Sequence, residues 1–230
     1  DIGWVRENVP CQAACPADTN IPGYIRTIVE GRYGRSYELN RIANILPGVL
    51  GRICSRPCEP VCRHGWPGNG EPVSICHLKR SAASLKAESH RISEDLYTPT
   101  GRRIAIVGGG PAGIAAAHDL SILGHNVTIY EREARAGGML RYGIPEFRLP
   151  REVLDIEVQN ATRMGVTLQT GVTVGCNEGD IPLSKLLDRF DAVLLATGCM
   201  AAMPLPLRDQ LDGRDLVQEM PNAEYGLNFL

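Results

Sequence analysis

A glycine-rich loop between an apolar run and a helix is the feature that most constrains how this chain can fold. Residues 103–107 are apolar after their first position, and the loop Gly108-Gly-Gly-Pro-Ala-Gly113 follows at once. Residues 114–123 are rich in alanine, and residues 126–130 form a second apolar run that is followed by Glu131. This order predicts a strand–helix–strand unit of about 30 residues, built on a parallel sheet.

The spacing of the three glycines indicates a dinucleotide-binding loop. In such a loop Gly108 permits the tight turn, Gly110 lets the backbone approach a pyrophosphate, and Gly113 lets the helix pack closely on the strand. The helix N-terminus supplies positive potential for phosphates. Glu131 lies 18 positions after Gly113, where an acidic side chain can accept hydrogen bonds from ribose hydroxyls. The flanking strands, the helix and Glu131 carry this prediction, because a bare glycine pattern occurs in many turns.

The rest of the second half continues to alternate helices and strands. Residues 151–164 predict a helix, residues 166–170 and 172–174 predict strands, and residues 181–190 predict a short helix. Residues 191–198 predict a buried apolar strand that ends in a turn of small residues. We therefore expect a Rossmann-like α/β domain.

The cysteines are concentrated in the first third of the chain. Two of the eight, Cys176 and Cys199, stand alone, and the other six are Cys11, Cys15, Cys54, Cys58, Cys62 and Cys76. Disulfides need an oxidising compartment, and nothing in the sequence signals export. Structural zinc favours Cys-x2-Cys pairs, whereas the spacing here is Cys-x3-Cys. The pattern favours iron–sulfur ligation, with zinc or non-ligating cysteines as the alternatives.

Six cysteines are fewer than the eight ligands that two four-iron clusters need. Either one cluster is complete and two cysteines are left over, or two clusters take ligands from elsewhere. His64, His77, Glu59 and Glu71 are near in sequence and could substitute, although each is more typical of an exposed loop.

Helical periodicity predicts the scaffold around these cysteines. We expect helices over residues 21–30, 33–46 and 73–89, the last with Cys76 on its first turn. Pro47 is expected to end the second helix, with a cysteine loop after it.

The predicted fold class is α+β with more than one domain. We expect an all-α iron–sulfur domain at residues 1–97, a linker at 98–101, and a Rossmann-like FAD-binding domain at 102–230 that is incomplete. The start at Asp1 instead of Met is expected of a chain that is processed or only partly represented here.

Composition excludes several classes of protein. With 43% hydrophobic and 22% charged residues, the chain has an ordinary globular composition. A net charge of −2 argues against nucleic-acid binding. No apolar run approaches the roughly 18 residues of a membrane span, and the first residues lack the charged-then-apolar pattern expected of a signal peptide. We expect a cytoplasmic protein with no membrane insertion.

Together these segments resemble one family. The glycine loop, then Gly137-Gly-Met-Leu-Arg-Tyr-Gly-Ile-Pro-Glu-Phe-Arg-Leu-Pro150, then Ala196-Thr-Gly198, all behind a cysteine-rich helical region, resemble the small (β) subunit of glutamate synthase. The N-terminal region of dihydropyrimidine dehydrogenase and the flavoprotein subunit of electron-bifurcating ferredoxin:NADP oxidoreductases are similar. The resemblance covers essentially the whole chain.

The resemblance implies bound FAD and an exchange of electrons with NAD(P)H. It implies that the flavin nucleotide contacts Gly108, Gly110, Pro111, Ala112, Gly113, Glu131, Arg132, Gly138, Met139, Leu140, Arg148, Val174, Ala196, Thr197 and Gly198. Without the family, Met139 and Leu140 are read equally well as core residues. No acid or base side chain is needed for hydride transfer, so we expect no catalytic residue of that kind.

The resemblance also implies [4Fe-4S] clusters that pass electrons to a partner. Cys15, Cys54 and Cys58 match ligands of one cluster, and Cys11 and Cys62 match ligands of another. Relatives have a further Cys-x2-Cys upstream, and they place the fourth ligand of the first cluster near Lys79. Cys76, one helical turn earlier, is our candidate substitute. The sequence is compatible with either one cluster or two.

Two functions follow as alternatives. In the first, an oxidoreductase subunit moves electrons between NAD(P)H, FAD and clusters to other redox subunits of a complex. In the second, the chain is an electron-relay or scaffold subunit without an NAD(P) site of its own, because the family's separate nucleotide-binding domain falls after the position of Leu230. A zinc-stabilised interaction module is a weaker third reading.

Overall fold

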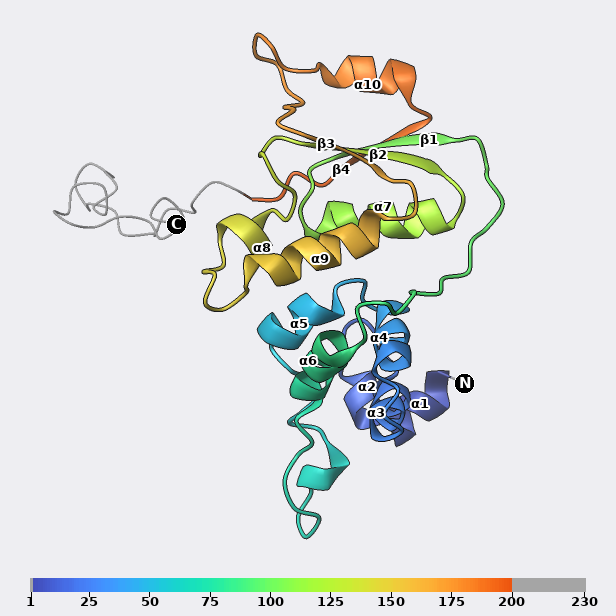
Figure 1. Ribbon diagram of the computed structural model, residues 1–230, viewed down its shortest axis with the longest axis vertical. Coiled ribbons are helices and arrows are strands. Elements are labelled where there is room, and N and C mark those ends of the chain that lie inside the picture. Colours follow the sequence, from blue (N-terminus) through green and yellow to red (C-terminus); the bar gives the residue numbers. More distant parts are fainter. Residues whose placement is uncertain (1, 200–230) are drawn as a thin grey trace, which may run out of the picture.

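The computed structural model describes residues 2–199, and the remainder of the predicted second domain, residues 200–230, lies outside the described residues. A group of helices forms the N-terminal part, and a parallel sheet with helices on both faces follows it (Figure 1). The predicted order, a helical part and then a Rossmann-like α/β part, is confirmed.

The N-terminal part is made of short helices. They are α1 (Ile2–Asn8), α2 (Pro10–Ala13), α3 (Ile21–Val29), α4 (Tyr33–Arg41), α5 (Pro47–Ile53), the 3-10 turn η1 (Arg63–Gly65) and α6 (Ile75–Leu85). The Asn20 side chain caps α3 by accepting a hydrogen bond from the Gly23 N–H at 3.0 Å. Tyr24 on α3 is fully buried, and its hydroxyl donates to the Ile75 carbonyl at the start of α6.

The helix expected over residues 33–46 ends earlier, because α4 stops at Arg41. A separate helix, α5, then begins at Pro47. Our expectation that Pro47 only ends a helix was wrong. Proline lacks an N–H, and the first turn of a helix does not need one, so Pro47 starts α5 instead.

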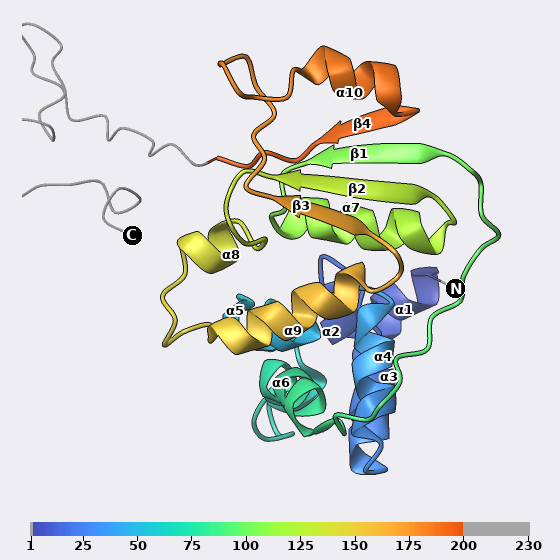
Figure 2. The same ribbon diagram turned by 45° about the horizontal axis from the view of Figure 1, so that its top comes forward.

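The second part is built on four parallel strands. Its elements are β1 (Arg103–Val107), α7 (Pro111–Ile122), β2 (Asn126–Glu131), α8 (Met139–Tyr142), α9 (Arg151–Thr162), β3 (Thr167–Thr170), α10 (Leu183–Arg189) and β4 (Ala192–Leu195). The strand order is β3-β2-β1-β4, with the centre of β1 paired to both β2 and β4. Helices α7 and α9 lie between the sheet and the N-terminal part, and α10 lies on the opposite face (Figure 2).

Strand β4 differs from the buried strand that we expected. Leu194 is 40% exposed and Leu195 is 59% exposed. Within residues 2–199, β4 pairs only with β1 and lies at one edge of the sheet, so its apolar side chains are not covered. The strand expected at residues 172–174 is reduced to a single bridge between Val174 and Ile181.

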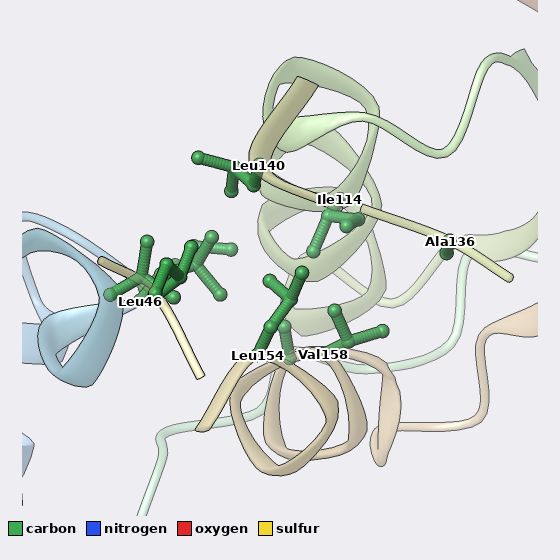
Figure 3. Close-up of a cluster of buried hydrophobic side chains, with 10 residues drawn as sticks. Leu46, Ile114, Ala136, Leu140, Leu154 and Val158 are labelled. Carbon is green, nitrogen blue, oxygen red and sulfur yellow. The ribbon is translucent and has the colours of Figure 1, made fainter. Parts of the chain in front are cut away.

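One apolar core joins the two parts of the chain. Leu46 and Val49, from the start of α5, pack with Leu154 and Val158 of α9 and with Ile114 of α7 (Figure 3). Leu154 and Ile114 are completely buried. Because this cluster takes side chains from both parts, neither part can be removed without exposing the apolar surface of the other.

Polar contacts cross the same boundary. The Tyr37 hydroxyl on α4 donates to Glu157 Oε1 on α9 at 3.0 Å, and both side chains are buried. Glu94, in the extended segment before β1, accepts from Arg41 of α4 at 2.6 Å and from Arg163 at 2.5 Å. These pairs fix how the helical part sits on α9.

None of the helices within residues 2–199 combines the length and apolar character needed to cross a bilayer.

Candidate functional site

A cavity of about 340 Å³ opens where the carboxyl ends of the strands meet. Val107 at the end of β1, Tyr130 and Glu131 at the end of β2, and Ala196 just after β4 line it. In parallel α/β sheets this edge is where ligands bind. The first turn of α7 also lines the cavity, and its leading N–H groups have no partners inside the helix.

The glycine loop takes the shape that the sequence predicts. Gly108 has φ +108°, a conformation that favours glycine, and a Cβ there would overlap the Ala196 carbonyl oxygen. A Cβ on Gly113 would overlap the Gly108 carbonyl oxygen, so this glycine lets α7 pack against the loop. A Cβ on Gly110, by contrast, would meet nothing closer than the Gly138 Cα at 3.7 Å. Glycine at 110 is therefore not needed by the fold itself and keeps the cavity open.

Glu131 is held at the cavity by two backbone donors. Its Oε2 accepts from the Gly109 N–H at 2.6 Å, and its Oε1 accepts from the Glu133 N–H at 2.8 Å. A carboxylate has about four acceptor positions, so Glu131 can still accept from ligand hydroxyls. The open loop, the free helix N-terminus and this carboxylate fit a dinucleotide of the FAD type.

The structure gathers most of the residues that the resemblance implied for FAD. The cavity is lined by Gly108, Gly110, Pro111, Ala112, Glu131, Arg132, Gly138, Met139, Val174, Ala196, Thr197 and Gly198. Gly113 lies behind the loop. Leu140 is buried in the shared core, and Arg148 is exposed outside the cavity.

Further residues line the cavity that the sequence did not single out: Val107, Tyr130, Glu133, Tyr142, Val172 and Thr173. Val107 and Tyr130 are paired in the sheet register. The rule that ligands lie at the carboxyl ends of strands could have found these two. Tyr142 sits on the short helix α8, which the sequence analysis did not predict.

Three cysteines of the helical part lie close together. Burial raises the pKa of Cys76 to about 12, and the charge of Cys54 and a hydrogen bond to its thiol add to this rise. Burial, and then the charges of Cys54 and Glu59, raise the pKa of Cys58 to about 11. The Cys76 N–H donates to Glu59 Oε1 at 2.9 Å, which links the start of α6 to the cysteine loop.

A buried lysine lies among these thiols. Lys79 is 6% exposed, and its charge opposes the rise in pKa of both Cys58 and Cys76. Burial tends to raise the pKa of Cys15, but the Thr19 hydroxyl, backbone N–H groups and the Lys79 charge outweigh it, so this pKa is lowered. A fixed cation of this kind stabilises thiolates, which are the form that binds metal.

Cys11 and Cys62 form a second group. Both line another cavity of about 340 Å³, together with Ile21 and Ile75. Burial raises the pKa of Cys11, and the charge of Cys62 raises it further. Both sets of cysteines act on Tyr24, whose pKa is raised first by burial and then by the charges of Cys58, Cys76, Cys11 and Cys15.

Within residues 2–199, no three His, Cys, Asp or Glu side chains are gathered closely enough to hold one metal ion. A four-iron cluster differs from one ion, because each thiolate binds a different iron atom and the ligands therefore lie farther apart. The spread of the thiols is therefore compatible with a four-iron cluster, although no three of these side chains are close enough for a single zinc ion. His64, His77 and Glu71 are exposed, and Glu59 is held by the Cys76 N–H.

The two parts of the chain match two known family models. Residues 6–91 match the model described as dihydropyrimidine dehydrogenase domain II, 4Fe-4S cluster. Residues 102–225 match the model described as pyridine nucleotide-disulphide oxidoreductase.

Curated relatives align with almost the whole chain. The NADP(+)-dependent formate dehydrogenase subunit beta of Moorella thermoacetica is 37% identical over 89% of this chain and 31% of its own length. The glutamate synthase [NADPH] small chain of Mycobacterium tuberculosis is 38% identical over 90% of this chain and 41% of its own. The NAD-dependent dihydropyrimidine dehydrogenase subunit PreT homolog of Salmonella typhi is 36% identical over 88% of this chain and 48% of its own length. The chain spans between about a third and a half of the length of these relatives.

These matches confirm the resemblance that the motifs indicated. The chain therefore belongs to the pyridine nucleotide-disulphide oxidoreductase family, in the group with an N-terminal 4Fe-4S domain to which the glutamate synthase small chain also belongs.

Proposed function

We propose that this chain is part of an NAD(P)H-dependent oxidoreductase subunit that moves electrons between FAD and iron–sulfur clusters and then to other redox subunits of a complex. The observation that carries this proposal is the cavity at the carboxyl ends of β1, β2 and β4, on a sheet whose helices pack directly against the cysteine-bearing part. The division that we propose is a cluster domain at residues 1–97 and an FAD domain beginning at residue 102.

The residues of the cavity have distinct roles in holding the nucleotide. The backbone from Gly108 to Ala112 and the first turn of α7 receive the pyrophosphate. Glu131 orients the ribose through its free acceptor positions. Met139 and Tyr142 give the apolar wall at the far end. Bound FAD links a two-electron hydride donor to one-electron carriers, which is the chemistry that this arrangement needs.

The residues that we propose as cluster ligands fall into the two observed groups. Cys15, Cys54, Cys58 and Cys76 form the first set, in which Lys79 acts on Cys15, Cys58 and Cys76, and Cys76 takes the place of the usual fourth ligand. Cys11 and Cys62 belong to a second set that is not complete within residues 2–199.

Gly110→Ala tests the FAD site, because the methyl group fits the fold but intrudes on the cavity. We expect the variant to keep the thermal stability of the flavin-free protein and to bind FAD at least about tenfold more weakly, which corresponds to about 1.4 kcal/mol. FAD affinity measured by the quenching of flavin fluorescence decides this. Unchanged affinity would show that the nucleotide does not approach the loop at residue 110.

Anaerobic titration with NADPH and with NADH tests the electron path. We expect bleaching of the flavin absorbance in the presence of the rest of the complex, and about four iron and four sulfide per complete cluster. Flavin that neither nucleotide reduces would favour the relay alternative. Zinc without sulfide would overturn the cluster assignment.

A further inference from the structure

A third cavity lies beside the proposed flavin cleft and is lined by three arginines. It has a volume of about 480 Å³ and is lined by the loop after β2, by the end of α8 with the residues that follow it, and by the first residue of α9. Arg135, Arg141 and Arg151 line it, together with Tyr142. Tyr142 lines the first cavity as well, so the two spaces share one wall.

Two of these arginines are fixed by backbone carbonyls. Arg151 donates to the Leu140 carbonyl at 3.1 Å and to the Ile144 carbonyl at 3.0 Å. Arg141 is 7% exposed, and its Nε donates to the Ala136 carbonyl at 2.7 Å. Carbonyls orient a guanidinium without neutralising it, so both groups keep their charge in a set position.

The acidic groups around the cavity do not balance this charge. Asp155 is the carboxylate partner of Arg141, and it also lies 3.5 Å from Arg135. Among residues 2–199, Arg151 has no carboxylate partner, and Arg141 Nη1 makes no hydrogen bond. Three guanidinium groups therefore face one carboxylate, which leaves a charge of about +2 on the wall of a cavity large enough for a small ligand.

We propose that this cavity binds a phosphate group of a ligand that reaches the flavin cleft past Tyr142. A guanidinium matches phosphate oxygens in pairs, and a phosphate monoester carries a charge of about −1.5 to −2 at neutral pH, which complements the cavity. The carbonyl-fixed arginines are preorganised, so little side-chain entropy is lost on binding. The site does not depend on the proposed electron transfer, because it is argued from the three arginines alone.

Calorimetry on the full chain, first without FAD and then with saturating FAD, tests the site. The probes are inorganic phosphate, pyrophosphate and, as a dicarboxylate, succinate. We expect pyrophosphate to bind more tightly than phosphate, and phosphate more tightly than succinate. Arg135→Gln is the main variant, because its side chain is 68% exposed and carries no carbonyl contact that the fold needs. It should weaken phosphate binding about tenfold, as expected for the loss of a charge-assisted hydrogen bond. Arg189→Gln, an exposed change on α10, is the charge-matched control and should leave binding unchanged.

Each outcome has one meaning. Equal weakening by Arg135→Gln and Arg189→Gln would show diffuse attraction to the surface and would overturn the site. Phosphate binding that disappears when FAD is saturating would place the anion in the flavin cavity and would also overturn it. Tighter binding of succinate than of phosphate would assign the cavity to carboxylates instead. Phosphate binding, together with flavin that neither nucleotide reduces in the presence of the rest of the complex, would keep the site and favour the relay alternative.

Discussion

Glu157 gives the sharpest test of how the two parts of the chain are joined. It is 3% exposed on α9, accepts from the Tyr37 hydroxyl, and has an Oε2 with no hydrogen-bond partner among the described residues. Burial raises the pKa of Glu157 to about 7, against the hydrogen bond from Tyr37 and the charges of Arg41 and Lys86, which lower it. The carboxyl group is therefore neutral in the folded protein under mildly acidic conditions.

The sign of the pH effect follows from proton binding. From pH 4.5 to about 7 the unfolded chain loses this proton and the folded chain keeps it, so the free energy of unfolding falls as the pH rises. Each pH unit lowers the free energy of unfolding by about 1.4 kcal/mol, so the rise from pH 4.5 to about 7 lowers it by up to about 3 kcal/mol. Below pH 4.5 and above about pH 7, Glu157 does not change how the free energy of unfolding depends on pH.

Glu157→Gln removes the titration and keeps an oxygen to accept from Tyr37. We expect its stability to lie within about 1 kcal/mol of the parent at pH 5 and to exceed it by up to about 3 kcal/mol at pH 8.5. Urea denaturation followed by helical circular dichroism at several pH values measures the difference. Glu152→Gln, an exposed change on the same helix, is the control and should leave the pH profile unaltered. Parallel pH profiles for the parent and Glu157→Gln would refute the argument, because they would mean that Glu157 ionises as easily inside the protein as in the unfolded chain.

Three further changes test other parts of the structure. Gly113→Ala should lower the free energy of unfolding by about 3 kcal/mol, because its Cβ would overlap the Gly108 carbonyl oxygen; thermal melting of the flavin-free protein checks this, and an unchanged melting temperature would contradict the packing. Cys54→Ser should lower the iron and sulfide content while FAD stays bound, whereas Cys176→Ser, an exposed change, should alter neither; equal iron loss in both would reject the ligand assignment. Glu94→Gln should cost about 3 kcal/mol of stability near pH 7, because Arg41 would lose its buried partner, and a loss below about 0.5 kcal/mol in urea denaturation would count against this network.

The part of the fold that was predictable is the part determined by local sequence. The strand, loop and helix over residues 103–123 depend on apolar periodicity and on glycines that few other residues can replace, so their positions agreed with the structure. The glycine loop and Glu131, which the sequence predicts as parts of a dinucleotide site, both line the cavity at the strand ends. Asn20, whose side chain caps α3, is a further local feature of this kind, because asparagine is favoured at the start of helices.

What could not be predicted depends on long-range packing. Leu140 could be a flavin contact or a core residue on sequence alone, and only the position of α5 against α9 places it in the core. The exposure of Leu195 depends on which strand, if any, lies beside β4. Pairs such as Tyr37 with Glu157 join residues 120 positions apart, so no local sequence pattern predicts them.

The core shared by α5, α7 and α9 has a consequence for a protein that has been cut. The connecting residues 95–101 are exposed and are open to proteases. A single cut there would break the chain, but the apolar contacts and the Tyr37–Glu157 pair would remain. The two fragments should therefore elute together from a gel-filtration column and separate only under denaturing conditions, as a heterodimer made from one gene product.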